Sequence, residues 1–184
     1  MTDFNTNNSM VVRNFLDKDT VATVSQYMEN CIAQGLYKEE IQIQARSYCR
    51  PTDPLIEIIL ENSCEQVEQL TGLKLYPTYS YARVYVKGNY LEAHVDRPSC
   101  EISLTVNVAS VGKPWEFMMK SPGKEPVAYI LEPGDALIYK GLEVLHWRNT
   151  PDCAEITAQF MLHYVDQSGP FAEYKFDKRS ALGK

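Results

Sequence analysis

The stretch ARVYVKGNYLEAHVDRPSCEISLTVNV, residues 82–108, decides the fold of this chain. β-Branched and aromatic residues fill both of its ends, which belong to the predicted strands Tyr79–Val86 and Glu101–Val108. Between these strands come a turn at Gly88 and the tripeptide His94-Val95-Asp96. Residues i and i+2 of an extended chain point to the same side. The stretch therefore predicts two strands joined by a segment that directs one imidazole and one carboxylate to a common point.

Side chains alternate along each of the two strands. One face is mainly apolar, and the other carries polar side chains or tyrosines. In the first strand that second face holds Tyr79, Tyr81, Arg83 and Tyr85. In the second strand it holds Glu101, Ser103, Thr105 and Asn107. A sheet that buries one side exposes such a face to water, whereas a barrel that holds a charged ligand uses it to line a pocket. The alternation does not choose between these two arrangements.

Outward from this stretch, the two parts of the chain differ in pattern. Downstream, residues 127–131, 136–139 and 156–165 are β-rich, with Pro, Gly and Asp between them. Upstream, apolar residues at helical spacing predict helices over 20–34 and from 55 to about 70. Asp17 or Asp19 is expected to cap the first helix, and Gly35 to end it. We expect an α+β fold in which the helices cover one face of a strand-rich double sheet.

The remaining segments and the composition narrow the class of protein. Residues 1–9 predict a disordered tail, and residues 10–16 a short strand. The net charge of −6 and the absence of any long Lys/Arg run argue against a nucleic-acid partner. No apolar run approaches the ~20 residues of a membrane helix, and no signal-peptide pattern is seen, so we expect a cytoplasmic protein without membrane contact. The five cysteines show no zinc spacing and are expected to be reduced thiols.

A second histidine completes a candidate metal site. Pro133-Gly134-Asp135 predicts a turn, residues 136–139 a strand, and residues 140–143 a loop that brings His146 to the sheet interior. Two histidines and one carboxylate leave about half of an octahedral shell open, which is typical of non-haem Fe(II) oxygenases. The tripeptide alone is weak evidence, because most such pairs are surface or hydrogen-bonded residues. His163, the third histidine, is expected to be a packed or hydrogen-bonded core residue.

The ordered set of motifs resembles the 2-oxoglutarate- and Fe(II)-dependent dioxygenases, and most of all their prolyl-hydroxylase-like branch. The resembling features are a strand with Tyr85, the turn at Gly88, the tripeptide His94–Asp96, and the segment EPGDALIYKGLEVLHWRN, residues 132–149. The resemblance covers about residues 73–166. It implies a double-stranded β-helix, or jelly-roll, core buttressed by N-terminal helices. We expect one dioxygenase domain over 10–184, with helical support at about 10–72, the core at about 73–166 and a C-terminal wrap over 167–184.

The resemblance also implies an activity and a set of site residues. His94, Asp96 and His146 would bind Fe(II), which would use 2-oxoglutarate and O₂ to hydroxylate an unactivated C–H bond. Members that halogenate lack this carboxylate, so Asp96 implies hydroxylation or a related oxidation. The implied substrate is a prolyl or other amino-acid residue, a free amino acid, a peptide or another small molecule, and the sequence does not choose among them. It predicts no oligomeric state.

The sequence departs from the family in one respect. The family holds the distal carboxylate of 2-oxoglutarate with a basic residue on the last strand, and residues 155–160 contain none. Arg83 and Arg148 are equal candidates for this role, and Lys140 is a weaker third. The other expected contacts to the cosubstrate are Tyr85, Thr105 and Asn107.

Other readings of the same residues stay open. One is a cupin-like metal-dependent dioxygenase that does not use 2-oxoglutarate, and another is a non-catalytic binding module with the same fold. Trp115 and Trp147 are expected to pack in the core. Residues 113–126 predict a hairpin arm or a loop near the mouth of the site, unless they form a solvated turn.

Overall fold

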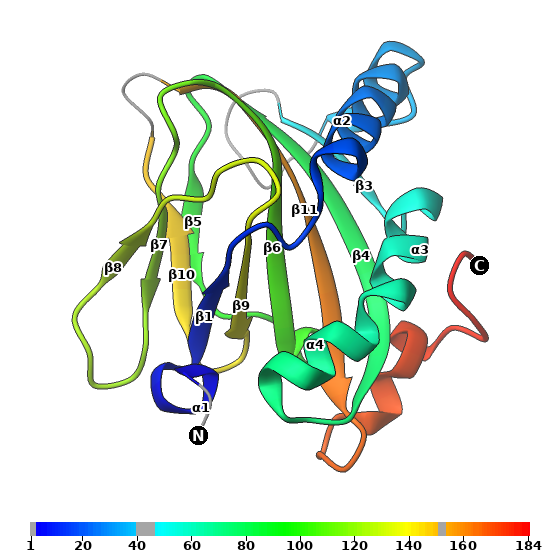
Figure 1. The fold of residues 1–184 in the computed structure, drawn as a ribbon, viewed down its shortest axis with the longest axis vertical. Coiled ribbons are helices and arrows are strands. Elements are labelled where there is room, and N and C mark those ends of the chain that lie inside the picture. The colour runs from blue at the N-terminus through cyan, green and yellow to red at the C-terminus, as the bar shows by residue number, and fades with distance from the viewer. Residues whose placement is uncertain (1–2, 40–46, 151–153) are drawn as a thin grey trace.

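The computed structural model describes residues 3–39, 47–150 and 154–184. Within these residues the strands pair antiparallel in two sheets (Figure 1). The large sheet has the order β1-β9-β6-β11-β4-β3-β2. Its strands are β1 (Ser9–Val12), β2 (Lys38–Glu39), β3 (Tyr48–Pro51), β4 (Leu75–Val86), β6 (Ile102–Gly112), β9 (Ala136–Lys140) and β11 (Ala154–Asp166). The helices and antiparallel sheets confirm the α+β class.

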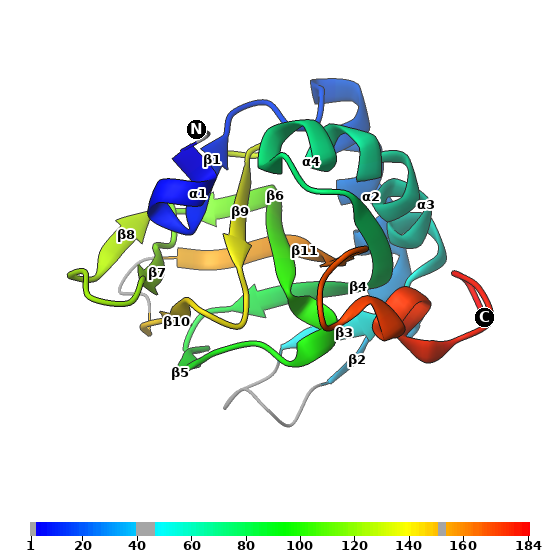
Figure 2. The same cartoon turned by 90° about the horizontal axis from the view of Figure 1, so that it is seen from below.

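The small sheet has the order β5-β10-β7-β8. Its strands are β5 (Leu91–His94), β7 (Phe117–Lys120), β8 (Val127–Tyr129) and β10 (Leu145–Arg148). Figure 2 shows this sheet on the opposite side of the molecule from helices α2, α3 and α4. Pairing of β7 with β8 confirms the predicted hairpin arm over residues 113–126.

Helices cover one face of the large sheet. They are α2 (Lys18–Ala33), α3 (Pro54–Asn62) and α4 (Cys64–Thr71). Asp17 caps α2 by accepting a hydrogen bond from the Thr20 amide, and Gly35 follows its end with a left-handed φ of 68°. The single helix expected from 55 to about 70 is wrong, because the chain breaks at Ser63 between α3 and α4. Asn and Ser are poor residues for a helix interior, since their side chains compete for backbone hydrogen bonds.

The main core lies between these helices and the large sheet. The apolar faces of the central strands meet the helices there, with Leu104, Val106 and Phe160 fully buried beside Val24 and Leu60. The opposite face of β6 does not meet water, because Ser103, Thr105 and Asn107 are at most 3 % exposed. The polar face of this strand is therefore directed into the molecule and is not exposed to water.

The expected disordered tail over 1–9 is wrong for the described part of it. Residues Asp3–Asn7 form helix α1, and Ser9 begins β1, which pairs with β9. Phe4 is fully buried in the main core. Burial of a phenylalanine side chain contributes about 1.5–3 kcal/mol, which offsets the entropy of ordering a short polar segment.

The last residues return to the body of the protein. The 3-10 segment η2 (Ala172–Lys178) lies against β4, and Arg179 Nη2 donates to Glu57 Oε1 of α3 at 2.7 Å. This Glu57 side chain is only 2 % exposed. Among the described helices, none combines the length and apolar character required to cross a membrane.

Candidate metal centre

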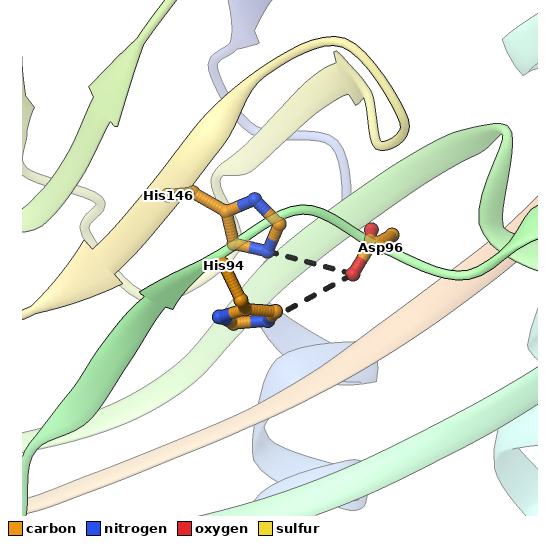
Figure 3. Close-up of side chains that lie close together, drawn as sticks. All are labelled: His94, Asp96 and His146. Carbon is orange, nitrogen blue, oxygen red and sulfur yellow. Dashed lines mark ion pairs between the residues drawn. The ribbon is translucent and has the colours of Figure 1, made fainter.

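The two histidines of the predicted site stand side by side in the small sheet. His94 ends β5 and His146 lies on β10, and the two residues are direct partners in the strand pairing. Their ring centroids are 4.3 Å apart. Asp96 follows two residues after His94, in the connection to the 3-10 turn η1 (Pro98–Cys100). Figure 3 shows the three side chains pointing toward one another.

The ligand atoms of these residues converge. Asp96 Oδ1 lies 3.9 Å from His94 Nε2 and 3.5 Å from His146 Nε2, and the three residues offer ligand atoms within 4.8 Å of one another. Metal–ligand bonds of about 2.1 Å place neighbouring ligand atoms about 3 Å apart. The two distances to Asp96 Oδ1 differ from this value by less than 1 Å, so small side-chain movements would let the set bind one divalent ion.

Backbone carbonyls orient both imidazoles for this role. His94 Nδ1 lies 2.8 Å from the Glu92 carbonyl, and His146 Nδ1 lies 3.0 Å from the Val144 carbonyl. A carbonyl only accepts hydrogen bonds, so each Nδ1 carries the proton and each Nε2 presents a lone pair. Histidine ligands in metal proteins are held in the same way. Burial, and after it the nearby His146, lowers the pKa of His94, which also favours the neutral ring.

Asp96 is held from the large sheet. Ser103 Oγ donates to Asp96 Oδ2 at 2.7 Å, which leaves Oδ1 for the histidines. Burial alone would raise the pKa of Asp96, but its contacts with His146 and Ser103 outweigh burial and lower that pKa. The Asp96 amide donates to the carbonyl of Gly141 at 2.9 Å. A Cβ at Gly141 would overlap Asp96 Oδ2 and the Cys100 carbonyl, so only glycine fits there.

A second group of metal-ligating types, Asp96, Cys100 and His163, shares the carboxylate. Burial raises the pKa of the Cys100 thiol to about 12, so this sulfur is protonated at neutral pH and is a poor ligand. His163 is buried, stacks on Tyr79 at 4.6 Å, and its Nδ1 lies 2.9 Å from Ser103 Oγ. The expectation that His163 is a packed, hydrogen-bonded residue is confirmed.

The metal-ligating group opens into a cavity of ≈ 510 Å³ between the two sheets. Strand pairing gives this cavity two ends, because Gln159 of β11 faces Arg83 of β4, whereas His163 stacks on Tyr79 farther along the same strands. Arg83 and Tyr85 line the first end. Tyr79, Arg97 and Asp177 line the second.

Only some of the residues expected to contact 2-oxoglutarate line the cavity. Tyr85, Arg83 and Thr105 line the cavity, and Arg83 Nη1 donates to Tyr85 Oη at 3.1 Å. Asn107 is not on the cavity wall, because its amide donates to the Leu131 carbonyl at 2.7 Å and to Ser110. Lys140 does not line the cavity either, and its Nζ lies 3.6 Å from Glu143 Oε1.

Arg148 is likewise a structural residue. Its guanidinium donates to the Trp115 carbonyl and to Gln159 Oε1, both at 2.7 Å, and burial lowers its pKa to about 10. Arg148 lies on the same buried side of β10 as His146, but these bonds hold its guanidinium behind the cavity wall. Trp115 is buried against Tyr85, as expected, whereas Trp147 is only half-buried.

Two residues of the site, Gly141 and Asp177, carried no recognisable signal in the sequence, whereas Ser103 lay on the polar face of a predicted strand. Gly141 approaches Asp96 from the loop before β10, and Asp177 reaches the cavity from η2. Only the folded chain brings them to the metal-ligating group. An invariant glycine could have been found by comparing related sequences, since it marks a close approach.

Comparison with known proteins gives matches in structure alone. No family model matches the sequence, and no curated protein matches it. A prolyl-4-hydroxylase from Pseudomonas putida superposes with a TM-score of 0.73, at 14% identity over 89% of this chain and 95% of that chain. EctD from S. alaskensis with bound Fe superposes with a TM-score of 0.72, at 16% identity over 95% of this chain and 82% of that chain.

A third neighbour was solved with both a metal and the oxoacid. HygX from Streptomyces hygroscopicus, with nickel and 2-oxoglutarate bound, superposes with a TM-score of 0.72, at 11% identity over 90% of this chain and 85% of that chain. The resemblance seen in the sequence motifs is thus matched by the whole fold. The chain has the fold of the 2-oxoglutarate- and Fe(II)-dependent oxygenases.

Proposed function

We propose that this protein is an Fe(II)- and 2-oxoglutarate-dependent oxygenase that hydroxylates a C–H bond of an amino-acid substrate. One observation carries the proposal: two Nε2 lone pairs and one carboxylate oxygen converge at the wall of a cavity, with both Nδ1 atoms held by carbonyls. His94, Asp96 and His146 would hold the iron. Such a set leaves coordination positions for an oxoacid and O₂ side by side.

Arg83 and Tyr85 are the residues we assign to the distal carboxylate of 2-oxoglutarate. Arg83 stands opposite Gln159, on the strand next to β11, where the family carries its basic residue. Both side chains line the cavity, and each is almost fully buried. A guanidinium beside a phenol hydroxyl offers a fork and an additional donor to a carboxylate. A basic residue on β4 thus replaces one on β11.

The bound iron and oxoacid would together activate O₂, which is chemistry that side chains alone do not supply. The protein's own residues do the remaining work. Ser103 and the two carbonyls fix the ligands, and the cavity holds the substrate close to them. We further propose that the two sheets form the double-stranded β-helix core of a single domain. The cavity then lies inside that β-helix.

Absorption spectroscopy tests the proposal directly. Fe(II) and 2-oxoglutarate, added without oxygen to the metal-free protein, should produce a weak visible charge-transfer band. The band should be absent from Asp96→Ala and His146→Ala. It should be present in the control variant Glu143→Gln, because Glu143 lies in a loop and does not line the cavity. With oxygen, succinate should form. Iron binding without the band, and without succinate, would favour a metal-dependent oxygenase that does not use 2-oxoglutarate.

A further inference from the structure

The end of the cavity away from Arg83 has a wall of its own. Tyr79, Tyr81 and Arg83 lie on the same face of β4 at every second position. Tyr79 is therefore four residues from Arg83 and lines the opposite end of the cavity. Tyr79 stacks on His163, whose Nδ1 lies 2.9 Å from Ser103 Oγ, the hydroxyl that holds Asp96. This aromatic wall runs directly to the metal-ligating group. It is available to a substrate once 2-oxoglutarate lies at the Arg83 end.

One cation and one anion stand at the rim of this end. Arg97 follows Asp96 in the sequence, and its two terminal nitrogens each donate to one carboxylate oxygen of Asp177 at 2.9 Å. The Arg97 guanidinium also lies over the Tyr79 ring, 4.5 Å from its centroid. The two side chains line the cavity and stay accessible, with exposed fractions of 49% for Arg97 and 25% for Asp177.

The backbone that presents Asp177 adopts an unfavourable conformation. Phe176, Asp177 and Lys178 are consecutive left-handed residues, with φ of 54°, 55° and 63°, and none is glycine. Such conformations cost free energy and persist where the surrounding structure imposes them, often at ligand sites. Arg179 imposes this one, because it donates to the Phe176 and Thr78 carbonyls and to the buried Glu57 carboxylate.

We propose that Arg97 and Asp177 form the recognition site for a free, zwitterionic α-amino acid, which is the substrate of the oxygenase. Arg97 receives the α-carboxylate and Asp177 the α-ammonium group, and the side chain of the amino acid lies along Tyr79 toward the metal. The inference rests on the proposed function, since it takes the Arg83 end as the place of 2-oxoglutarate.

A zwitterion suits this pair better than any singly charged ligand. An anion alone would take Arg97 and leave Asp177 without its cation, and a cation alone would leave Arg97 without its anion. A zwitterion replaces both partners at once. Opening the pair for a zwitterion therefore leaves neither Arg97 nor Asp177 without a partner of opposite charge. An internal peptide residue carries neither charge, so it gains nothing from this site.

The size of the cavity agrees with a small substrate. Ligand sites range over roughly 300–1,000 Å³, and this cavity of ≈ 510 Å³ must hold the cosubstrate as well. A free amino acid fits the remainder.

The test is binding to the protein loaded with Fe(II) and 2-oxoglutarate under nitrogen. The probes are the twenty genetically encoded L-amino acids, with the N-acetyl and carboxamide derivatives of any that binds. Binding is followed by calorimetry and by the change in the visible band. We expect at least one free amino acid to bind saturably, and each derivative to bind about tenfold to hundredfold more weakly.

Variants connect that selectivity to the two residues. Asp177→Asn should weaken binding of the free amino acid by about tenfold to hundredfold and abolish the preference over the N-acetyl derivative. Arg97→Gln should weaken binding of the free amino acid to the same extent and abolish the preference over the carboxamide derivative. Glu173→Gln removes an exposed carboxylate from the same segment and should change neither. These preferences are a readout that a merely destabilised protein would not alter selectively.

The possible failures can be told apart. A loaded protein that shows the visible band but binds none of the twenty amino acids overturns this inference and leaves the proposed function standing. Equal binding of free and N-acetyl forms by the wild-type protein overturns it too. If no band forms at all, the proposed function itself has failed, and the inference fails with it.

Discussion

At the scale of single residues, Gly141 sets how closely the loop before β10 approaches Asp96. A Cβ there would overlap both Asp96 Oδ2 and the Cys100 carbonyl. We expect Gly141→Ala to push the carboxylate away from the histidines and to weaken Fe(II) binding about tenfold to hundredfold, as loss of a supporting contact does in metal sites. Titration of the metal-free protein with Fe(II) under nitrogen measures this change.

Gly123→Ala provides the control for that substitution. Gly123 has a φ of 71° and no atom within 4 Å of its added Cβ, so the alanine strains the turn without touching the metal centre. It should cost about 1 kcal/mol in unfolding free energy and leave iron affinity unchanged. Equal iron affinities for the two variants would show that Gly141 does not position Asp96.

Arg83 and Arg148 should respond to substitution in opposite ways. Arg83 lines the cavity, so Arg83→Gln should raise the KM for 2-oxoglutarate by about tenfold to hundredfold with a small change in stability. Arg148 is held by the Trp115 carbonyl and Gln159, so Arg148→Gln should lower the unfolding free energy by about 3 kcal/mol or more. Succinate assays at varied 2-oxoglutarate and urea unfolding give both numbers. A raised KM in Arg148→Gln alone would reverse the assignment.

The same pair of arginines shows what the sequence predicts of the site. Spacing within one short segment was enough for His94 and Asp96, because i and i+2 share a face in an extended chain. It was not enough for Arg148, which shares the buried side of β10 with His146 but is bound there by the Trp115 carbonyl and Gln159. Alternation predicts the side of a strand on which a residue lies, but it does not reveal which partners bind the side chain there.

At the scale of elements, Asp135 ties the turn before β9 to the residues that follow β1. Its carboxylate accepts hydrogen bonds from Arg13 at 2.5 Å, from the Asn14 amide at 3.0 Å and from the Glu132 amide at 3.0 Å. The carboxylate is 4% exposed. Asp135→Asn should therefore lower the unfolding free energy by about 1–3 kcal/mol at pH 7, measured by urea unfolding.

The pH dependence of this contribution has a definite sign. Burial alone would raise the pKa of Asp135, but its bonds to Arg13, Asn14 and Glu132 outweigh burial and lower that pKa below its ordinary value. A carboxylate with a lowered pKa stabilises the fold above its unfolded value and loses this contribution as pH falls through its folded value. The difference between wild type and Asp135→Asn should shrink below about pH 3.9. A difference that stays constant down to pH 2 would contradict this account.

Helix α2 was predicted from the sequence with both of its ends, whereas three strands beside the cavity were not predicted. Helix α2 has sixteen residues with a cap and a terminating glycine, so its periodicity and its ends are both visible. Strands β5, β7 and β10 have four residues each, which is too short for a period to emerge. Side chains such as His94, Phe117 and His146 on these strands line the cavity, so chemistry determines their identity more than sheet propensity does.

At the scale of the whole molecule, the metal centre joins the two sheets. His94 and His146 belong to the small sheet, whereas Asp96 is held by Ser103 of β6 in the large sheet. A contact between positions far apart in the chain has no local signature unless a motif marks both of its residues. For the same reason the Arg97–Asp177 pair, whose members are 80 positions apart in the chain, could not be predicted from the sequence.

A metal that bridges the sheets should stabilise the small sheet most. Binding to the folded state alone adds about 2.7 kcal/mol at a free metal concentration of 100 Kd, which is about 5–10 °C in Tm for a chain of this size. Under nitrogen, Fe(II) should raise Tm by this amount in the wild-type protein and leave His94→Ala unchanged. Hydrogen exchange should slow most at the amides of β5 and β10, and amides of α2 that exchange by local opening should keep their rate, because α2 packs on the far side of the large sheet. Uniform slowing of all elements would mean that the metal stabilises the protein globally, and exchange that does not change in β5 would place the metal elsewhere.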